Sequence, residues 1–220
     1  MSRSNQLYYD DCLTVMQDKL GPCSTDLIYL DPPFNSNRAY NAIYKDETGR
    51  PLPEQVEAFC DQWTLDGERI RAIHQLPVLM RKSGIDNDTA EFWRLWMKSL
   101  RRTDPRLLAY LSYMTERLLP MRGILKPTGS IYLHCDPTAS HYIKVMLHGV
   151  FGKKNFRNEI VWAYRTGGAS KRHWPRKHDI PLFYIKSGLY KHHPIQERIF
   201  YHKPFFSEQV DEQGRYFADV

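Results

Sequence analysis

The stretch Thr25-Asp26-Leu27-Ile28-Tyr29-Leu30-Asp31-Pro32-Pro33-Phe34 decides the fold class of this 220-residue chain. Its first six residues form an apolar run typical of a buried parallel strand. Two prolines then end the strand, because proline has no backbone N–H to donate. Residues 31–34 therefore lie where a strand leaves a sheet, which is where ligands bind in open α/β sheets.

Residues 31–34 have a specific recognition capacity. The Asp31 carboxylate can accept a hydrogen bond from an exocyclic amine, and Pro32 and Pro33 offer carbonyl acceptors on a stiff backbone. Phe34 offers a flat face for stacking. Together these groups suit an amino-bearing base that has been pulled out of a duplex. For Asp-Pro-Pro alone, a simple turn after a strand is the alternative.

Four further segments favour the functional reading. They are Tyr8-Tyr9-Asp10-Asp11-Cys12-Leu13, Gly129-Ser130-Ile131-Tyr132-Leu133-His134-Cys135-Asp136, Asn155-Phe156-Arg157-Asn158-Glu159-Ile160-Val161-Trp162 and His178-Asp179-Ile180-Pro181-Leu182-Phe183-Tyr184. Taken in order with residues 31–34, they resemble the amino-methylating DNA methyltransferases. The similarity is greatest to the adenine-directed, beta-type arrangement, in which the catalytic motif precedes the cofactor-binding motif. The resemblance extends from about residue 7 to about residue 186.

The resemblance implies methylation of the exocyclic amine of a flipped adenine, with Asp31, Pro32, Pro33 and Phe34 as the catalytic residues. Asp31 and a proline carbonyl would accept the two amine hydrogens, and Phe34 would stack on the base. Aspartate at the first position is usual for adenine enzymes, whereas cytosine-amine enzymes more often carry serine. Methylation of cytosine N4, of RNA or of protein amines is therefore the less favoured alternative.

The same resemblance implies S-adenosyl-L-methionine as cofactor, with Asp11, Cys12 and Asp31 as its binding residues. Asp11 matches the acidic residue near the adenosine portion of the donor, although the family commonly has Gly-Asp where this chain has Asp10-Asp11. A helix cap at Asp11 is the alternative. His134 and Asp136 are two ligands without a third, so we expect a strand-end cap there and no metal site.

Positive charge is concentrated after residue 152. Residues 153–203 contain 12 of the 31 basic side chains and three acidic ones, which gives a net charge of +9. Basic and aromatic side chains interleave in this block, as suits DNA phosphates and unstacked bases. A solvated basic face is the alternative. The expected contacts to double-stranded DNA are Arg38, Arg165, Lys171, Arg172, Arg176 and Lys177.

The order of expected elements is β-α-β, a mostly helical insertion over about residues 45–102, and then α-β-α-β-β. This order predicts an α/β fold with a partial Rossmann-like methyltransferase sheet that is mostly parallel. Residues 6–9 are the expected first strand, and residues 54–63 and 91–100 the expected helices of the insertion. We expect residues 1–187 to form the catalytic domain and residues 188–220 to begin a target-recognition region.

The donor-binding Phe-x-Gly-x-Gly-like turn of the family does not occur in this sequence. We therefore expect an incomplete catalytic domain that needs a homodimer partner or a complementary C-terminal chain, and a restriction nuclease partner is also open. A non-catalytic DNA-binding remnant, or one subunit of a split enzyme, is the competing hypothesis. The sequence has no signal peptide, no apolar run of about 18 residues and no Cys-x-x-Cys pair, which predicts a cytoplasmic protein with free thiols and no membrane contact.

Overall fold

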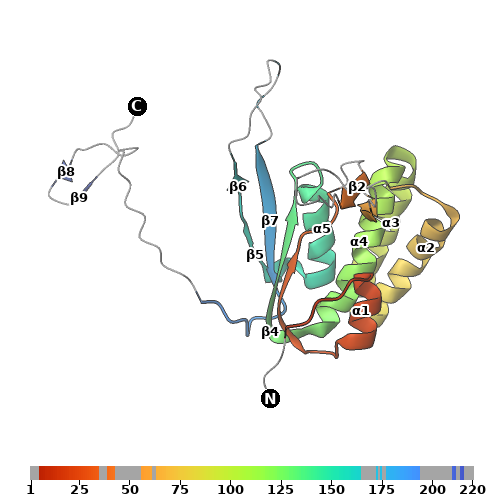
Figure 1. Ribbon diagram of the computed structural model, residues 1–220, viewed down its shortest axis with the longest axis horizontal. Coiled ribbons are helices and arrows are strands. Elements are labelled where there is room, and N and C mark those ends of the chain that lie inside the picture. Colours follow the sequence, from red (N-terminus) through yellow and green to blue (C-terminus); the bar gives the residue numbers. More distant parts are fainter. Residues whose placement is uncertain are drawn as a thin grey trace, which may run out of the picture.

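The computed structural model describes residues 5–34, 39–42, 56–60, 63–164, 172, 174, 177–193, 210–211 and 214–215. A five-stranded sheet carries helices packed on one of its faces (Figure 1). The strands of this sheet are β1 (Thr25–Leu30), β4 (Leu125–Cys135), β5 (Phe156–Glu159), β6 (Trp162–Ala163) and β7 (His178–Ile185). The helices are α1 (Cys12–Lys19), α2 (Gly67–Lys82), α3 (Asn87–Thr103), α4 (Pro105–Ile124) and α5 (Ser140–Phe151). The remaining elements are the strand pairs β2 (Ala39–Ala42) with β3 (Val56–Cys60) and β8 (Val210–Asp211) with β9 (Gly214–Arg215), and the short 3-10 helix η1 (Lys153–Asn155).

The strand order is β1-β4-β7-β5, and β6 also pairs with β7. Only β1 and β4 run parallel among the described pairs of this sheet, whereas β4, β5 and β6 are all antiparallel to β7. The prediction of a mostly parallel sheet is therefore wrong for these strands. The physical reason is the connection: α5 returns the chain from β4 to β5, but no described helix lies between β6 and β7. A strand that returns without a helical crossover pairs antiparallel.

Two local expectations are also wrong. Residues 6–9 belong to no strand, and residues 56–60 form β3 rather than part of a helix. β3 pairs antiparallel with β2, so strand pairing decides the conformation of this short segment. The expected helix over residues 91–100 is confirmed within α3. The domain boundaries stay predictions.

The core lies between the sheet and α4. Asp104 caps α4 by accepting a hydrogen bond from the Leu107 amide, and Pro105 occupies the first turn. Both features are favourable at a helix N-terminus. The apolar positions at helical spacing, such as Leu111 and Leu118, are fully buried. Ile131 of β4 contributes to the same core from the sheet.

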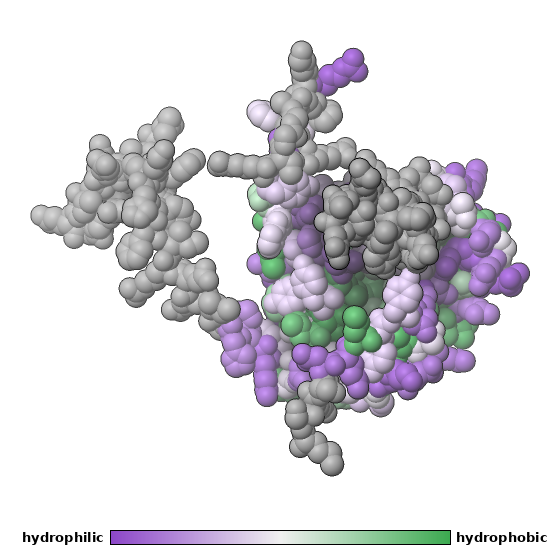
Figure 2. Space-filling model, viewed as in Figure 1, coloured by the Kyte–Doolittle hydropathy of each residue, from purple (hydrophilic) through white to green (hydrophobic). Residues whose placement is uncertain are grey.

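No described helix covers the other face of the sheet, which is exposed along β1 (Figure 1). Leu27 and Tyr29 of β1 are 57% and 58% exposed, while Ile28 and Leu30 pack against the core. β1 is thus buried on one face, and not on both as a continuous apolar run predicts. Figure 2 shows apolar side chains gathered near β1 and α1 with polar ones around them. None of the described helices is long and apolar enough to cross a membrane.

Candidate active site

The carboxyl ends of β1 and β4 bring residues 31–34 beside His134. The two strands are parallel and Leu30 lies opposite Leu133, so the chain leaves the sheet at Asp31 next to His134. Asp31 is exposed, and the following three residues are partly buried. The Phe34 ring lies 5.6 Å from the His134 ring, centroid to centroid, at an interplanar angle of 38°.

His134 is held by side chains from two neighbouring strands. Its Nδ1 lies 3.0 Å from the hydroxyl of Tyr29, which precedes the tetrapeptide on β1. Its Nε2 lies 3.3 Å from Oδ2 of Asp179 on β7, which is an ion-pair distance without hydrogen-bond geometry. The hydroxyl of Tyr164 donates to Oδ1 of Asp179 at 3.5 Å. The ring beneath Phe34 is therefore fixed from both sides.

The cap expected at this strand end from His134 and Asp136 is made by Asp136, at the start of the connection to α5, and not by His134. Oδ1 of Asp136 accepts hydrogen bonds from the amides of Thr138 and Ala139 at 3.0 and 3.1 Å. The sequence did carry a signal for the role of His134. Tyr29, His134 and Asp179 each lie at an end of a strand that points to one edge of the sheet, which is where binding groups gather.

Asp11 lies at the N-terminus of α1 and links that helix to α4. Its Oδ1 accepts a hydrogen bond from the Leu13 amide at 2.8 Å, and its Oδ2 forms an ion pair with Arg117. The Arg117 guanidinium in turn lies 3.3 Å above the Tyr113 ring centroid, a cation–π contact. Burial opposes the charged form of Asp11, yet the Leu13 amide and Arg117 hold the pKa of this carboxyl below its usual value. Asp11 therefore caps α1, and its role in binding the cofactor stays a prediction.

Asp11 and Cys12 belong to this α1–α4 cluster, whereas Asp31 and Phe34 belong to the end of β1. Cys12 is partly buried, and that burial raises the pKa of its thiol. The Asp11 side chain stays 44% exposed. Since a carboxylate offers roughly four lone-pair sites, Asp11 retains capacity to accept hydrogen bonds from ligand hydroxyls. Within the described residues, no three His, Cys, Asp or Glu side chains gather as a metal site.

Two of the expected DNA contacts, Arg172 and Lys177, lie in the described part of the chain, in the connection that leads from β6 into β7. β7 is antiparallel to β4 with Ile180 opposite Cys135, so β7 begins at the edge where β4 ends. Lys177 directly precedes β7, and its carbonyl accepts a hydrogen bond from the Tyr164 amide at 3.1 Å. Arg172 is exposed, and the nearby Trp174 is 93% exposed. The other expected contacts, Arg38, Arg165, Lys171 and Arg176, lie outside the described residues.

A family model described as DNA methylase matches residues 25–220 of this chain. The chain belongs to the DNA methylase family. The matched range begins at β1 and includes residues 31–34, His134 and Asp179. The resemblance inferred from the ordered motifs is thus confirmed for the family.

Curated relatives of this chain include a type II methyltransferase and Mod subunits of type III restriction-modification enzymes. The chain is 26% identical over 191 residues to the type II methyltransferase M.KpnI of Klebsiella pneumoniae, which covers 86% of this chain and 34% of that protein. It is 30% identical over 139 residues to the StyLTI Mod subunit of a type III restriction-modification enzyme of Salmonella typhimurium. This match covers 63% of this chain and 17% of that protein. The EcoP15I Mod subunit of Escherichia coli is 23% identical over 140 residues, 64% of this chain and 17% of that protein. The chain spans about a third or less of the length of these relatives.

Proposed function

We propose that this chain carries the catalytic motif of an S-adenosylmethionine-dependent DNA methyltransferase that modifies the exocyclic amine of a flipped adenine. The observation that supports it most is the position of residues 31–34. They leave the sheet at the carboxyl end of β1, with Phe34 against a fixed His134, in a chain of the DNA methylase family.

The proposed mechanism is one of positioning. Asp31 and a carbonyl of Pro32 or Pro33 accept the two amine hydrogens, which moves the nitrogen towards a tetrahedral geometry and directs its lone pair outward. Phe34 stacks on the base, and His134 supports the ring from behind. Correct orientation of two reacting groups can contribute about 7–11 kcal/mol to lowering a barrier. After the new bond has formed, the amine nitrogen releases one of its two protons to solvent water.

S-adenosylmethionine is the proposed methyl donor, and Asp11, Cys12 and Asp31 are the residues proposed to hold it. The exposed part of the Asp11 carboxylate fits hydrogen bonds to sugar hydroxyls. When bound, the donor would supply a methyl group carried on a sulfonium sulfur, and that sulfur would become a neutral thioether once the methyl group is transferred. Arg117 keeps Asp11 charged and fixed at the start of α1 for that role.

Double-stranded DNA is the proposed substrate, with the basic residues after β6 as phosphate contacts. Arg172 and Lys177 belong to the connection that enters β7 at the edge holding Asp31. Exposed Trp174 and Trp162 supply aromatic faces for unstacked bases. The names of the Mod relatives support a place in a restriction-modification system with a nuclease as partner. We also propose that a second copy or a complementary C-terminal chain completes the donor site, because the donor-binding turn does not occur in this sequence.

The test is transfer of tritium from labelled S-adenosylmethionine to unmethylated bacterial DNA by this chain completed with a donor-binding C-terminal half. Asp31→Asn removes the proposed acceptor charge. Asp26→Asn is the matched control, because Asp26 is an exposed aspartate of β1, the strand that precedes Asp31, and its side chain pairs with Lys126. We expect Asp31→Asn to lower transfer at least about 100-fold and Asp26→Asn to leave it unchanged. Equal transfer by wild type and Asp31→Asn would contradict the proposal. DNA binding without transfer by any of the three proteins would favour a non-catalytic DNA-binding role.

A further inference from the structure

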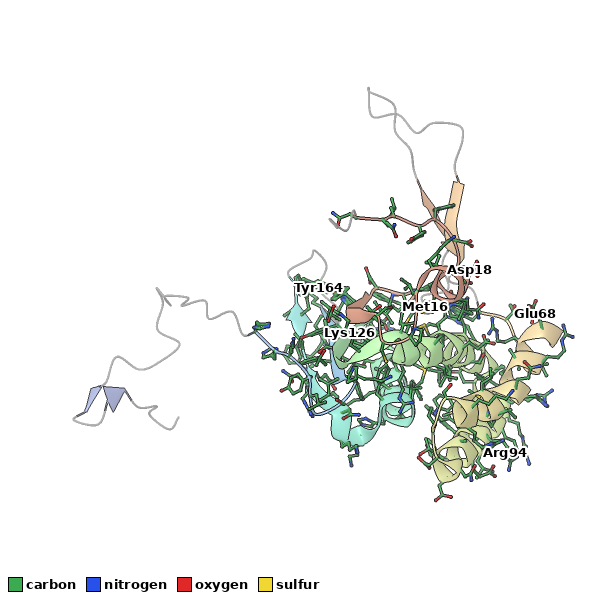
Figure 3. The ribbon with its side chains drawn as sticks, turned by 90° about the horizontal axis from the view of Figure 1, so that it is seen from below. Met16, Asp18, Glu68, Arg94, Lys126 and Tyr164 are labelled. Carbon is green, nitrogen blue, oxygen red and sulfur yellow. The ribbon has the colours of Figure 1, made fainter. Side chains whose placement is uncertain are left out.

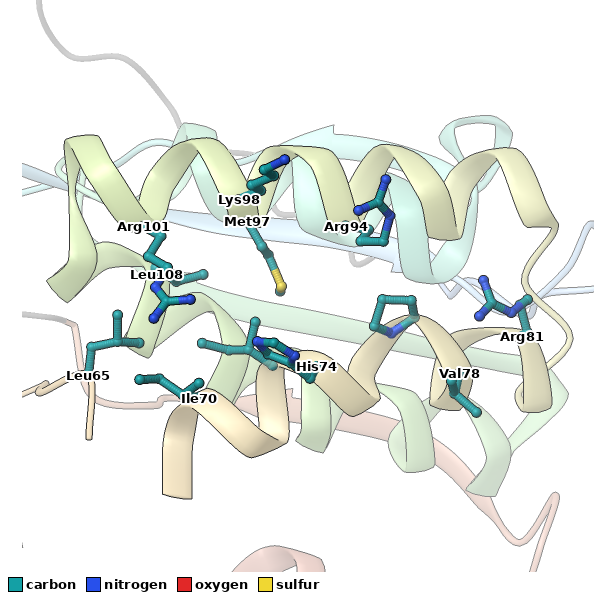
Figure 4. Close-up of a pocket in the computed structure, with 12 residues that line it drawn as sticks. Leu65, Ile70, His74, Val78, Arg81, Arg94, Met97, Lys98, Arg101 and Leu108 are labelled. Atoms are coloured by element: carbon teal, nitrogen blue, oxygen red, sulfur yellow. The ribbon is translucent and has the colours of Figure 1, made fainter. Parts of the chain in front are cut away.

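Helices α2 and α3 line an open groove on the side of the molecule away from the candidate active site. The groove has a volume of about 390 Å³ and is shown in Figure 4. In Figure 3, Glu68 on α2 and Arg94 on α3 lie far from Tyr164, which follows β6. Figure 1 agrees, because α2 and α3 form the outer helices while β6 and β7 lie at the other end. The groove is therefore separate from the site described above.

The walls of the groove follow the helical repeat. The lining residues of α2 are Ile70, Ile73, His74, Pro77, Val78 and Arg81. Their spacing of three and four residues marks one face of a helix. The lining residues of α3 are Arg94, Met97, Lys98 and Arg101, which repeat the same spacing. The stripe from residue 70 to residue 81 is about 16 Å long at 1.5 Å per residue.

The lining combines apolar and basic groups. Val78 is 46% exposed, so apolar surface of α2 stays open to solvent. Arg81, Lys98 and Arg101 add positive charge, and none of the described lining residues is acidic. Arg94 is already paired with Glu91 at 2.5 Å. Arg81 also lies close enough to Glu91 to help lower the pKa of that carboxyl. The least compensated charge of the groove therefore lies with Lys98 and Arg101.

We propose that this groove binds an amphipathic helix of a partner protein, one with an apolar stripe flanked by acidic side chains. A groove of about 16 Å matches roughly three turns of a helix, and such a stripe is how helices occupy grooves between helices. The acidic flanks complement Arg81, Lys98 and Arg101. Duplex DNA offers phosphates but no apolar stripe, and a compact anion fills only part of this length.

The test uses a fluorescein-labelled synthetic peptide of about 18 residues, long enough to form a helix. Leucines spaced three and four residues apart form one face, and glutamates flank them. A second peptide carries the same leucines with lysines in place of the glutamates. Fluorescence anisotropy measures binding of each to the full chain. The groove variant is Lys98→Glu with Arg101→Glu, and the matched control is Arg71→Glu with Arg102→Glu, two exposed cations of the same helices outside the groove.

We expect the acidic peptide to bind in the micromolar range and the lysine peptide not to bind. The groove variant should weaken binding at least about tenfold and the control variant less than about twofold. The proposal is overturned by an acidic peptide that does not bind, or by equal losses in the two variants. It is also overturned if unlabelled duplex DNA displaces the peptide. Sedimentation equilibrium gives a further refuting outcome, namely a wild-type dimer that the groove variant converts to monomer, because the occupant is then a second copy.

Discussion

Gly149 of α5 lies against the indole of Trp93 of α3, and a methyl group there should destabilise the fold. A Cβ at position 149 would lie 2.5 Å from Nε1 and 3.2 Å from Cδ1 of Trp93, and 3.5 Å from Cγ2 of Thr89. Trp93 is fully buried, so its ring has little room to move. Overpacking of this kind costs about 1–3 kcal/mol. Alanine recovers about 1 kcal/mol through its higher helix propensity. Since a 2.5 Å approach is too short for any real Cβ contact, we expect a net loss of about 1–2 kcal/mol for Gly149→Ala.

The measurement is urea unfolding of Gly149→Ala, with Gly123→Ala as the control. Gly123 is also helical, in α4, and no atom lies within 4 Å of a Cβ built there. The control should therefore be neutral or gain up to about 1 kcal/mol from propensity alone. Both variants should keep the wild-type dependence on urea, since neither changes the surface exposed on unfolding. A Gly149→Ala protein as stable as wild type would refute the packing of α3 on α5 described here.

The remaining predictions concern the site and the pH dependence. His134→Ala removes the ring behind Phe34. Steady-state kinetics should show that the rate of methyl transfer falls about tenfold, while the affinity for S-adenosylmethionine stays unchanged. An unchanged rate of transfer would show that the ring does not support catalysis. The pKa of Asp11 is lowered in the folded state, so its stabilisation is complete above its ordinary pKa of 3.8 and is lost as the pH falls through the folded value. Below about pH 4, the free energy of unfolding of Asp11→Asn should therefore fall less steeply with decreasing pH than that of the wild type. The same pH dependence in both proteins would count against the pairing with Arg117. Burial and two nearby lysines lower the pKa of His148 from 6.5, so stability should decline as the pH falls below that value, and thermal unfolding of His148→Gln should lack this decline.

Local signals in the sequence predicted the helical half of the fold well. Asp104 and Pro105 mark the start of α4 because a cap and a first-turn proline act within a few residues of one another. The direction of β7 could not be predicted in this way. A two-residue periodicity is the same for parallel and antiparallel strands, and direction depends on which strand the segment pairs with. Residues 56–60 were misassigned for a related reason, since pairing with β2 decides the conformation of so short a segment.

The candidate site was predicted in part. The position of residues 31–34 at a strand end followed from Leu30 and the two prolines, which are local signals. His134 beneath Phe34 and the ion pair of Asp11 with Arg117 depend on side chains that are 100 and 106 positions apart in the chain. No periodicity links residues so far apart, and only the folded arrangement brings them into contact.

The most direct test of the proposed chemistry is mass-spectrometric analysis of nucleosides from DNA incubated with the chain and S-adenosylmethionine. We expect N6-methyl-2′-deoxyadenosine from the wild-type chain completed with a donor-binding C-terminal half, and none from the Asp31→Asn form of the same completed chain. The appearance of N4-methyl-2′-deoxycytidine instead, or the same yield of methylated adenine from both proteins, would contradict an adenine methyltransferase that acts through Asp31.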